Sequence, residues 1–350
     1  MIRELLGKLV KGLDLTRMEA AQAMEEIMEG KSSPSLIAAY LTALRVKGET
    51  VEEITGSAEV MRRKSTRIPV HGRTLDLDRE DINLDRETVL DTCGTGGSGT
   101  NTFNISTATA FVVSAAGVKV AKHGNRAASS HCGSADVLEA LGVNLQVTPE
   151  QVAMFIERIG IGFLFAPLLH SAMKFVAPVR KELGIRTIFN VLGPLTNPAG
   201  ADTQVLGVYS RNLTAKIAAV LKNLGTRRAF VVHGEDALDE LTISGRTHVT
   251  ELQNGHLTHY SVRPEDFGLR SAPTESVRGG DAEVNADIIQ RLLDGEPGPP
   301  RDVVLLNAGF ALTAAGRCDT PKEGIALASD MIDSGKAQAS LRALRELSRA

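Results

Sequence analysis

The 350-residue sequence contains no tryptophan, and only 4% of its residues are aromatic. Few side chains are therefore available to stack on unpaired bases. The formal net charge of −3 also argues against a protein held on nucleic acid by bulk positive charge, so we expect no nucleic-acid partner. No apolar run approaches the ~20 residues that a membrane-spanning helix needs, and we expect no membrane partner.

Cysteine is also scarce. Cys93, Cys132 and Cys318 form no C-x-x-C pair and leave one thiol over, which argues against a disulfide framework. Residues 1–12 lack the apolar stretch of a signal peptide, and we expect a cytoplasmic protein. Apolar residues make up 43% of the chain, which is ordinary for a soluble globular protein and enough for two domains.

The pattern of apolar residues divides the chain in two. Residues 1–66 show only helical patterns, with capping-box spacing at Thr16/Glu19 and Thr50/Glu53. From Thr88 onward strand and helix patterns alternate, which predicts an α/β fold with a central, mainly parallel sheet flanked by helices. The expected strands are 88–91, 118–121, 162–165, 204–209 and 229–232, followed by an edge hairpin at 248–262.

A glycine-rich stretch, DTCGTGGSGTNTFNIST, runs from residue 91 to 107 between an expected strand and an expected buried helix. Its glycines allow positive φ and close approach of a ligand, and the helix N-terminus favours an anion. The motif is neither a GxxxxGK[ST] phosphate loop nor a complete dinucleotide fingerprint. A glycine-rich turn alone is often only a turn. If this stretch binds a ligand, we expect a phosphate or diphosphate.

Three further motifs follow expected strands. Residues 122–136, KHGNRAASSHCGSAD, offer a lysine and hydroxyls suited to phosphate. Adjacent carboxylates at Asp239 and Glu240 suit Mg²⁺, and the fork of Arg180 suits a planar carboxylate. Each residue alone is commonly a solvated surface group. In α/β sheets, however, ligands bind at the carboxyl ends of strands, so we expect the motifs to meet there.

The glycine-rich string and the KHGNR string together resemble those of the anthranilate phosphoribosyltransferase family, and the resemblance covers nearly the whole chain. It implies transfer of the 5-phosphoribosyl group from phosphoribosyl diphosphate (PRPP) to the amino group of anthranilate in tryptophan biosynthesis. It also implies Mg²⁺ and a homodimer. Residues 1–66 and about 170–192 would form a small dimerisation and anthranilate-side domain. Residues 67–169 and 193–350 would bind PRPP and magnesium.

The same resemblance implies the roles of individual residues. Catalytic charge stabilisation falls to Lys122, Asp239 and Glu240, and magnesium binding to Ser106, Asp239 and Glu240. The expected PRPP-binding residues are Gly94, Thr95, Gly96, Gly97, Ser98, Thr102, Asn104, Ser106, Thr107, Lys122 and Ser134. The expected anthranilate-binding residues are Gly94, His123, Asn125, Arg180, Gly193 and Pro194.

The sequence departs from the family pattern in places. Ser98 stands where the family commonly has Asp, Ser171 replaces a proline and should affect helix entry only, and the 67–87 connector is long. Two alternatives remain open. One is a pyrimidine nucleoside phosphorylase, whose lysine-serine-glycine phosphate loop is absent here. The other is a non-catalytic nucleic-acid-binding paralogue, which the intact Arg180, Asn125, Asp239 and Glu240 argue against.

Overall fold

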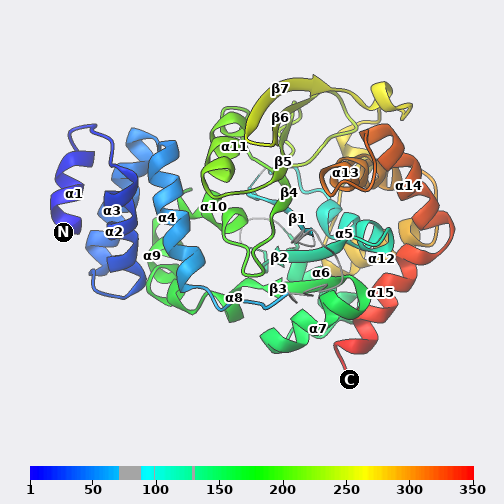
Figure 1. Cartoon of the computed structure of the whole chain (residues 1–350), viewed down its shortest axis with the longest axis horizontal. Helices are drawn as coiled ribbons and strands as arrows, with labels where there is room; N and C mark the ends of the chain where they lie inside the picture. Colours follow the sequence, from blue (N-terminus) through cyan, green and yellow to red (C-terminus); the bar gives the residue numbers. More distant parts are fainter. Residues whose placement is uncertain (71–87, 98, 128–130) are drawn as a thin grey trace, which may run out of the picture.

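The computed structural model describes residues 1–70, 88–97, 99–127 and 131–350. A helical domain lies beside a larger α/β domain (Figure 1). The helical domain begins with α1 (Ile2–Leu9), α2 (Arg17–Met28), α3 (Pro34–Lys47) and α4 (Val51–Lys64). Both expected capping boxes form: the Thr16 and Thr50 side chains accept from the amides of Glu19 and Glu53, whose carboxylates accept in return.

A later segment of the chain packs into the helical domain. It comprises η1 (Ser171–Phe175) and α9 (Ala177–Leu183), and α9 contacts α3 (Figure 1). Val176 and Val179 are buried in the same apolar cluster as Tyr40 and Leu44. This packing supports our placing of residues 170–192 with the helical domain. The exact domain limits stay a prediction.

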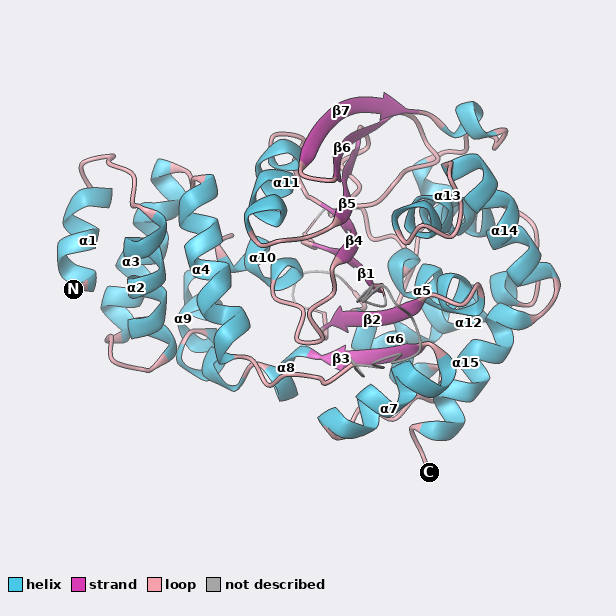
Figure 2. Cartoon of the chain, in the orientation of Figure 1, coloured by secondary structure: helices cyan, strands magenta, loops and turns pink. Residues whose placement is uncertain are grey.

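A seven-stranded sheet forms the centre of the α/β domain, in the order β3-β2-β1-β4-β5-β6-β7 (Figure 2). Strands β1 to β5 pair in parallel, and β6 and β7 add an antiparallel hairpin at the edge. The bounds are β1 (Val89–Gly94), β2 (Lys119–Gly124), β3 (Ile161–Phe165), β4 (Thr203–Gly207), β5 (Arg228–Gly234), β6 (Thr247–Gln253) and β7 (His256–Val262). The expected fold class is confirmed.

Helices cover both faces of the sheet because successive strand residues point to opposite sides. These helices are α5 (Ile105–Ala115), α6 (Ser134–Ala140), α7 (Pro149–Ile159), α8 (Ala166–Leu169), α10 (Phe189–Leu192), α11 (Leu213–Asn223), α12 (Ala282–Leu293), α13 (Pro299–Ala314), α14 (Pro321–Asp333) and α15 (Lys336–Leu347). Val205 and Phe230 pack on the cluster that contains α5 and α13, whereas Leu206 and Val231 pack on the cluster that contains α11. Short 3-10 turns are η2 (Gly193–Leu195), η3 (Pro264–Phe267) and η4 (Thr274–Val277). Of the helices in the described ranges, none is both long and apolar enough to cross a membrane.

The strand ends differ from expectation where the motifs begin. Strand β2 continues to Gly124 instead of stopping at Ala121, and β1 continues to Gly94 instead of Asp91. The extra residues pair with neighbouring strands: Lys122 lies opposite Phe163 of β3, and Cys93 opposite Leu206 of β4. Lys122 and His123 are therefore strand residues with fixed directions rather than loop residues.

Candidate active site

A cavity of about 680 Å³ opens at the carboxyl ends of the parallel strands and extends to the α8–η2 segment. This is the position at which α/β sheets bind ligands. The cavity brings together most of the expected site residues: Gly94, Thr95, Gly96, Gly97, Asn104, Ser106, Thr107, Lys122, His123, Asn125, Ser134, Arg180, Gly193, Pro194, Asp239 and Glu240.

Three parts of the expected site are not found in the cavity as predicted or have a further role. Thr102 is not among the described residues that line the cavity and instead forms a β-bridge with Arg278, so its contact with PRPP stays a prediction. Ser98 and residues 71–87 of the connector lie outside the described residues. Ser171 begins η1, as a helix-entry role requires, but it also lines the cavity, so that expectation was incomplete.

The glycine-rich loop passes very close to Asp239. The Gly96 amide donates to Asp239 Oδ2 at 2.8 Å, and a Cβ on Gly94 would lie 2.7 Å from the same oxygen. Gly96 and Gly97 also have φ of 67° and 76°, which side-chain-bearing residues rarely adopt. Glycine is therefore required here both for backbone conformation and for the approach of the loop to the carboxylate.

Lys122 is buried beneath this loop. Its Nζ donates to Thr92 O at 2.6 Å and to Ser106 Oγ at 3.1 Å. Burial lowers the pKa of Lys122, and the carboxyl groups of Asp91 and Glu240 oppose that effect. The ammonium group thus lies between the start of α5 and the acidic residues that follow β5, where an anion bound to the loop would meet it.

Asp91 helps to fix the strand that carries Lys122 and His123, a role that the glycine-rich motif did not indicate. It is completely buried, and burial raises its pKa to about 6. Its carboxylate accepts from the His123 amide at 3.2 Å and from Asn197 Nδ2 at 2.8 Å. Asn197 Nδ2 also donates to Ala121 O, so both residues fix the end of β2.

Glu240 accepts hydrogen bonds from the backbone and side chain of Ser106 and lies near the charges of Asp239 and Lys122. Shielding from solvent, followed by repulsion from Asp239, raises the pKa of Glu240 to about 8. Asn307 of the buried helix α13 holds the next residue: its Oδ1 accepts from Leu241 N at 3.1 Å, and its Nδ2 donates to Leu241 O at 2.9 Å. An Asn within an apolar helix was the sequence signal for this contact, and we missed it.

The residues present fit Mg²⁺. Two carboxylates and the Ser106 hydroxyl provide only oxygen ligands. Repulsion between the carboxylates of Asp239 and Glu240 favours a bound cation. Within the described part of the chain, no group of three or more His, Cys, Asp or Glu could hold a metal. A magnesium ion here would therefore take its other ligands from water or substrate, as it commonly does.

The cavity is also lined by His123, His170 and Arg180. The two Nε2 atoms of the histidines lie 3.2 Å apart. Burial lowers the pKa of His123 to about 3 and of His170 to about 4, so both rings are neutral at pH 7. Arg180 lies over the Phe189 ring at 5.5 Å and keeps its charge although burial lowers its pKa. A guanidinium beside neutral rings suits a small planar anion.

Comparison with known proteins bears directly on this arrangement. The family model "Glycosyl transferase family, helical bundle domain" matches residues 3–65, and "Glycosyl transferase family, a/b domain" matches residues 86–338. A protein of Geotalea uraniireducens named anthranilate phosphoribosyltransferase is 59% identical over 99% of both chains. The chain belongs to the anthranilate phosphoribosyltransferase family. A Geobacter sulfurreducens member is 58% identical over 98% of both chains.

Solved structures of family members share the fold. The Thermus thermophilus enzyme has a TM-score of 0.90 and 46% identity, with 99% of each chain covered. The Saccharomyces cerevisiae enzyme, in complex with PRPP and Mg, has a TM-score of 0.87 and 29% identity, covering 99% of this chain and 98% of that one. The resemblance carried by the glycine-rich and KHGNR strings is therefore confirmed over the full chain.

Proposed function

We propose that the protein transfers the 5-phosphoribosyl group of PRPP to the amino group of anthranilate, giving N-(5-phosphoribosyl)anthranilate and diphosphate for tryptophan biosynthesis. The observation that carries this proposal is a single cavity lined both by the glycine-rich loop with Lys122 and by Arg180 with two neutral histidines. Relatives that are 55–59% identical carry the corresponding name, and the yeast enzyme was solved with PRPP and Mg.

The reaction breaks the bond between C1 of the ribose and diphosphate, and forms a C1–N bond as the amine loses a proton. Negative charge grows on the leaving group, so fixed donors and cations aimed at it lower the barrier. Lys122, which lines the cavity beside the loop 94–97, meets that need. Ser106, Asp239 and Glu240 would hold Mg²⁺, which supplies further positive charge to the diphosphate.

Anthranilate would lie beside Arg180. The guanidinium of Arg180 can pair with both carboxylate oxygens, while His123, Asn125, Gly193 and Pro194 line the space around the ring. The aromatic amine is neutral at pH 7 and therefore needs no general base to become nucleophilic. The contribution of these residues is to hold the amine in line with the departing diphosphate.

The direct test is loss of anthranilate fluorescence with purified protein, PRPP and Mg²⁺. We expect loss that requires PRPP and is abolished by EDTA, because the two carboxylates and the hydroxyl do not stabilise diphosphate without the cation. No loss with folded protein would contradict the proposal. Phosphorolysis of thymidine or uridine would then support the nucleoside phosphorylase alternative, and salt-dependent binding of single-stranded DNA the paralogue.

Arg180→Lys should raise the KM for anthranilate by about 10- to 100-fold, because a lysine cannot replace both bonds of the guanidinium fork. The KM for PRPP should change little. Initial rates at varied concentrations of each substrate measure both values. Lys181→Met, at the exposed neighbouring position, is the control and should behave as wild type. An equal rise in both KM values would contradict the assignment of Arg180 to anthranilate.

We also propose a homodimer formed through the helical domain, in the cytoplasm. All three cysteines are free thiols, which suits a reducing compartment. Exposed apolar side chains gather at one end of the helical domain, where Val10 and Val46 are 74% and 83% exposed. Lys47 pairs with Asp14 at 2.7 Å, so the end of α3 lies beside the α1–α2 connection. Such an apolar surface is typical of an interface between subunits.

Val46→Asp should convert the proposed dimer into monomers, because the new carboxylate would be buried without a partner. Light scattering coupled to size exclusion gives the mass. Val284→Asp, at an exposed apolar position on α12 of the other domain, should leave the mass unchanged. A monomeric wild-type protein, or a Val46→Asp variant that is still dimeric, would contradict this interface.

A further inference from the structure

Arg186 joins two parts of the structure that the two substrates would occupy separately. It lies in the short connection between α9, which carries Arg180, and α10, which leads to Gly193 and Pro194. The side chain is exposed and is not among the described residues that line the cavity. Yet its guanidinium reaches across to the glycine-rich loop.

The contact of Arg186 with the loop has two components. Its Nη2 donates a hydrogen bond to the carbonyl oxygen of Gly97. The guanidinium carbon lies 4.4 Å from the centre of the Tyr209 ring, well within the range of a cation–π interaction. A Cβ on Gly97 would lie 3.4 Å from both Nε and Nη2, so the loop backbone packs directly on the guanidinium. Hydrogen bonding and stacking together hold Arg186 in one orientation.

Tyr209 is itself attached to the same loop. Its amide donates to Thr95 Oγ1 at 3.0 Å, and the Thr95 amide donates to Gly207 O at 2.9 Å. The loop is thus held at Thr95 by the end of β4, at Gly96 by Asp239, and at Gly97 by Arg186. Only the last of these anchors comes from the segment that carries the anthranilate-side residues.

Residues that line the cavity flank Arg186 on both sides. Arg180 precedes it on α9, which ends at Leu183 and is followed by Gly184. Asn190 follows it, lines the cavity, and accepts from the Thr187 amide at 3.0 Å through its side chain. A ligand that fixes Arg180 and Asn190 therefore also restricts the connection that positions Arg186.

We infer that Arg186 is a positioning residue that couples the two substrate sites: a carboxylate bound at Arg180 strengthens the binding of PRPP by fixing the glycine-rich loop at Gly97. The inference rests on the proposed function. Because coupling between two sites is reciprocal, PRPP must strengthen carboxylate binding by the same factor. A factor of about ten is typical of such coupling.

The test measures binding of PRPP with Mg²⁺ by calorimetry, without and with saturating benzoate, which has the carboxylate of anthranilate but no amine to react. Wild type and the control Lys181→Met should bind PRPP about tenfold more tightly with benzoate. Arg186→Met keeps the apolar stem but removes the charge and the donors, and should reduce this ratio to about one. Thermal melting confirms that each variant is folded.

Tyr209 provides a second, independent arm. Tyr209→Phe keeps the ring and should retain the wild-type ratio, whereas Tyr209→Leu should reduce it. The double variant Arg186→Met/Tyr209→Leu should be no worse than Arg186→Met alone, because both changes remove one contact. Additive losses would show that the two residues act separately and would overturn the inference.

Two further outcomes would also overturn it. One is a ratio of one in the wild type. The other is an unchanged ratio in Arg186→Met; if PRPP binding is then weaker to the same extent with and without benzoate, Arg186 is a direct diphosphate ligand. Failure of the proposed function is distinguishable, because wild-type protein would then consume no anthranilate whatever the binding ratio.

Discussion

Replacing Lys122 with methionine should lower kcat by about 10³-fold, the range observed when one fixed charge-stabilising donor is removed from an active site. The Lys122 side chain is only 3% exposed, and its Nζ lies 3.1 Å from Ser106 Oγ. Bulk water therefore cannot replace the lost charge. The leaving diphosphate would develop its negative charge beside the carboxylates of Asp91 and Glu240 with no ammonium group between them.

A matched control lies on the same strand. Lys119 is at the outer end of β2 and pairs with Glu157 at 2.7 Å, away from the cavity. Lys119→Met should keep kcat within about twofold, because a surface ion pair contributes little. Initial rates at saturating anthranilate and PRPP measure both variants. A folded Lys122→Met protein with near-wild-type kcat would contradict the charge-stabilisation mechanism.

Glu240→Gln addresses the same end of the cavity if Lys122→Met does not fold. It keeps the shape of the side chain and removes one of two adjacent acidic groups. The Lys122 ammonium group stays in place and keeps Asp91 as an acidic neighbour. Activity should fall, and the Mg²⁺ concentration needed for half-maximal rate should rise, because the oxygen set at Ser106 and Asp239 loses a charged member. Unchanged magnesium dependence would contradict the proposed ligand set.

The sequence predicted the glycine-rich loop and the strand-end motifs because these depend on local order: strand, glycine turn, helix. It also predicted that they meet, because parallel strands place their carboxyl ends on one side of a sheet. The strand limits were too short at β1 and β2. The residues from Thr92 to Gly94 and from Lys122 to Gly124 are held in strands by neighbours distant in sequence, such as Leu206 and Phe163.

The supporting residues could not be predicted for a related reason. His170 meets His123, Asn307 holds the backbone of Leu241, and Arg186 reaches Gly97, each across a long stretch of chain. A polar residue within an apolar helix, such as Asn307, indicates that a partner exists, but the residues beside it do not indicate which partner. Chemistry-bearing motifs are local in sequence, whereas the groups that orient them are selected by the packing of separate elements.

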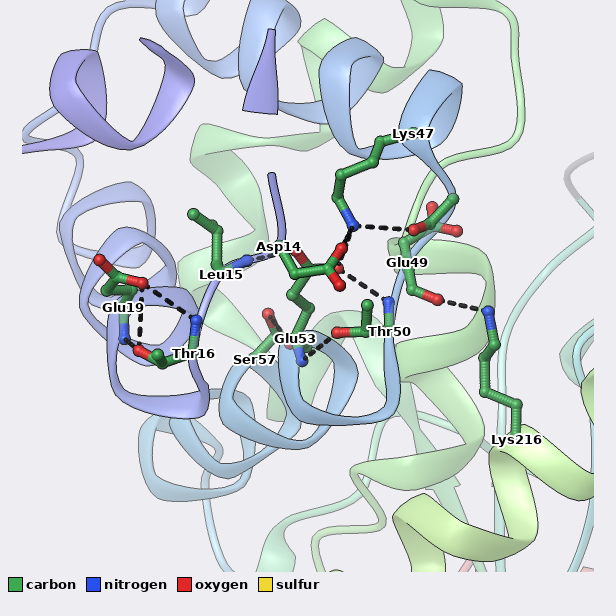
Figure 3. Close-up of polar contacts among 11 residues, drawn as sticks. Asp14, Leu15, Thr16, Glu19, Lys47, Glu49, Thr50, Glu53, Ser57 and Lys216 are labelled. Atoms are coloured by element: carbon green, nitrogen blue, oxygen red, sulfur yellow. Dashed lines mark hydrogen bonds and ion pairs between the residues drawn. The ribbon is translucent and has the colours of Figure 1, made fainter. Parts of the chain in front are cut away.

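The largest loss of stability should follow from Glu53→Ala. Glu53 is completely buried, and its carboxylate accepts from the amides of Leu15 at 2.9 Å and Thr50 at 2.8 Å and from Lys47 Nζ at 3.0 Å (Figure 3). Lys47 keeps its second partner, Asp14, so its charge is not left alone. The two amides lose their acceptor, at about 1–3 kcal/mol each. We expect the free energy of unfolding to fall by about 2–6 kcal/mol.

The chain contains its own control for this prediction. Thr16 and Glu19 form a capping box with the same spacing, and Figure 3 shows it beside the Glu53 cluster. The Glu19 side chain contacts Thr16 and Lys8 at the surface, so water can replace it in Glu19→Ala. Urea unfolding, followed by the loss of helical signal, gives the free energy of unfolding of both variants and of wild type.

The outcome separates two explanations for the Glu53 position. If Glu53 acts only within its capping box, Glu53→Ala and Glu19→Ala should lose similar stability, because each removes the bond to one N-cap amide. If the buried carboxylate joins three elements, as its contacts with Leu15, Lys47 and Thr50 indicate, Glu53→Ala should lose clearly more. Lys216 of α11 also donates to Glu49 O beside this cluster (Figure 3). Loosening α4 should therefore weaken the contact between the two domains as well.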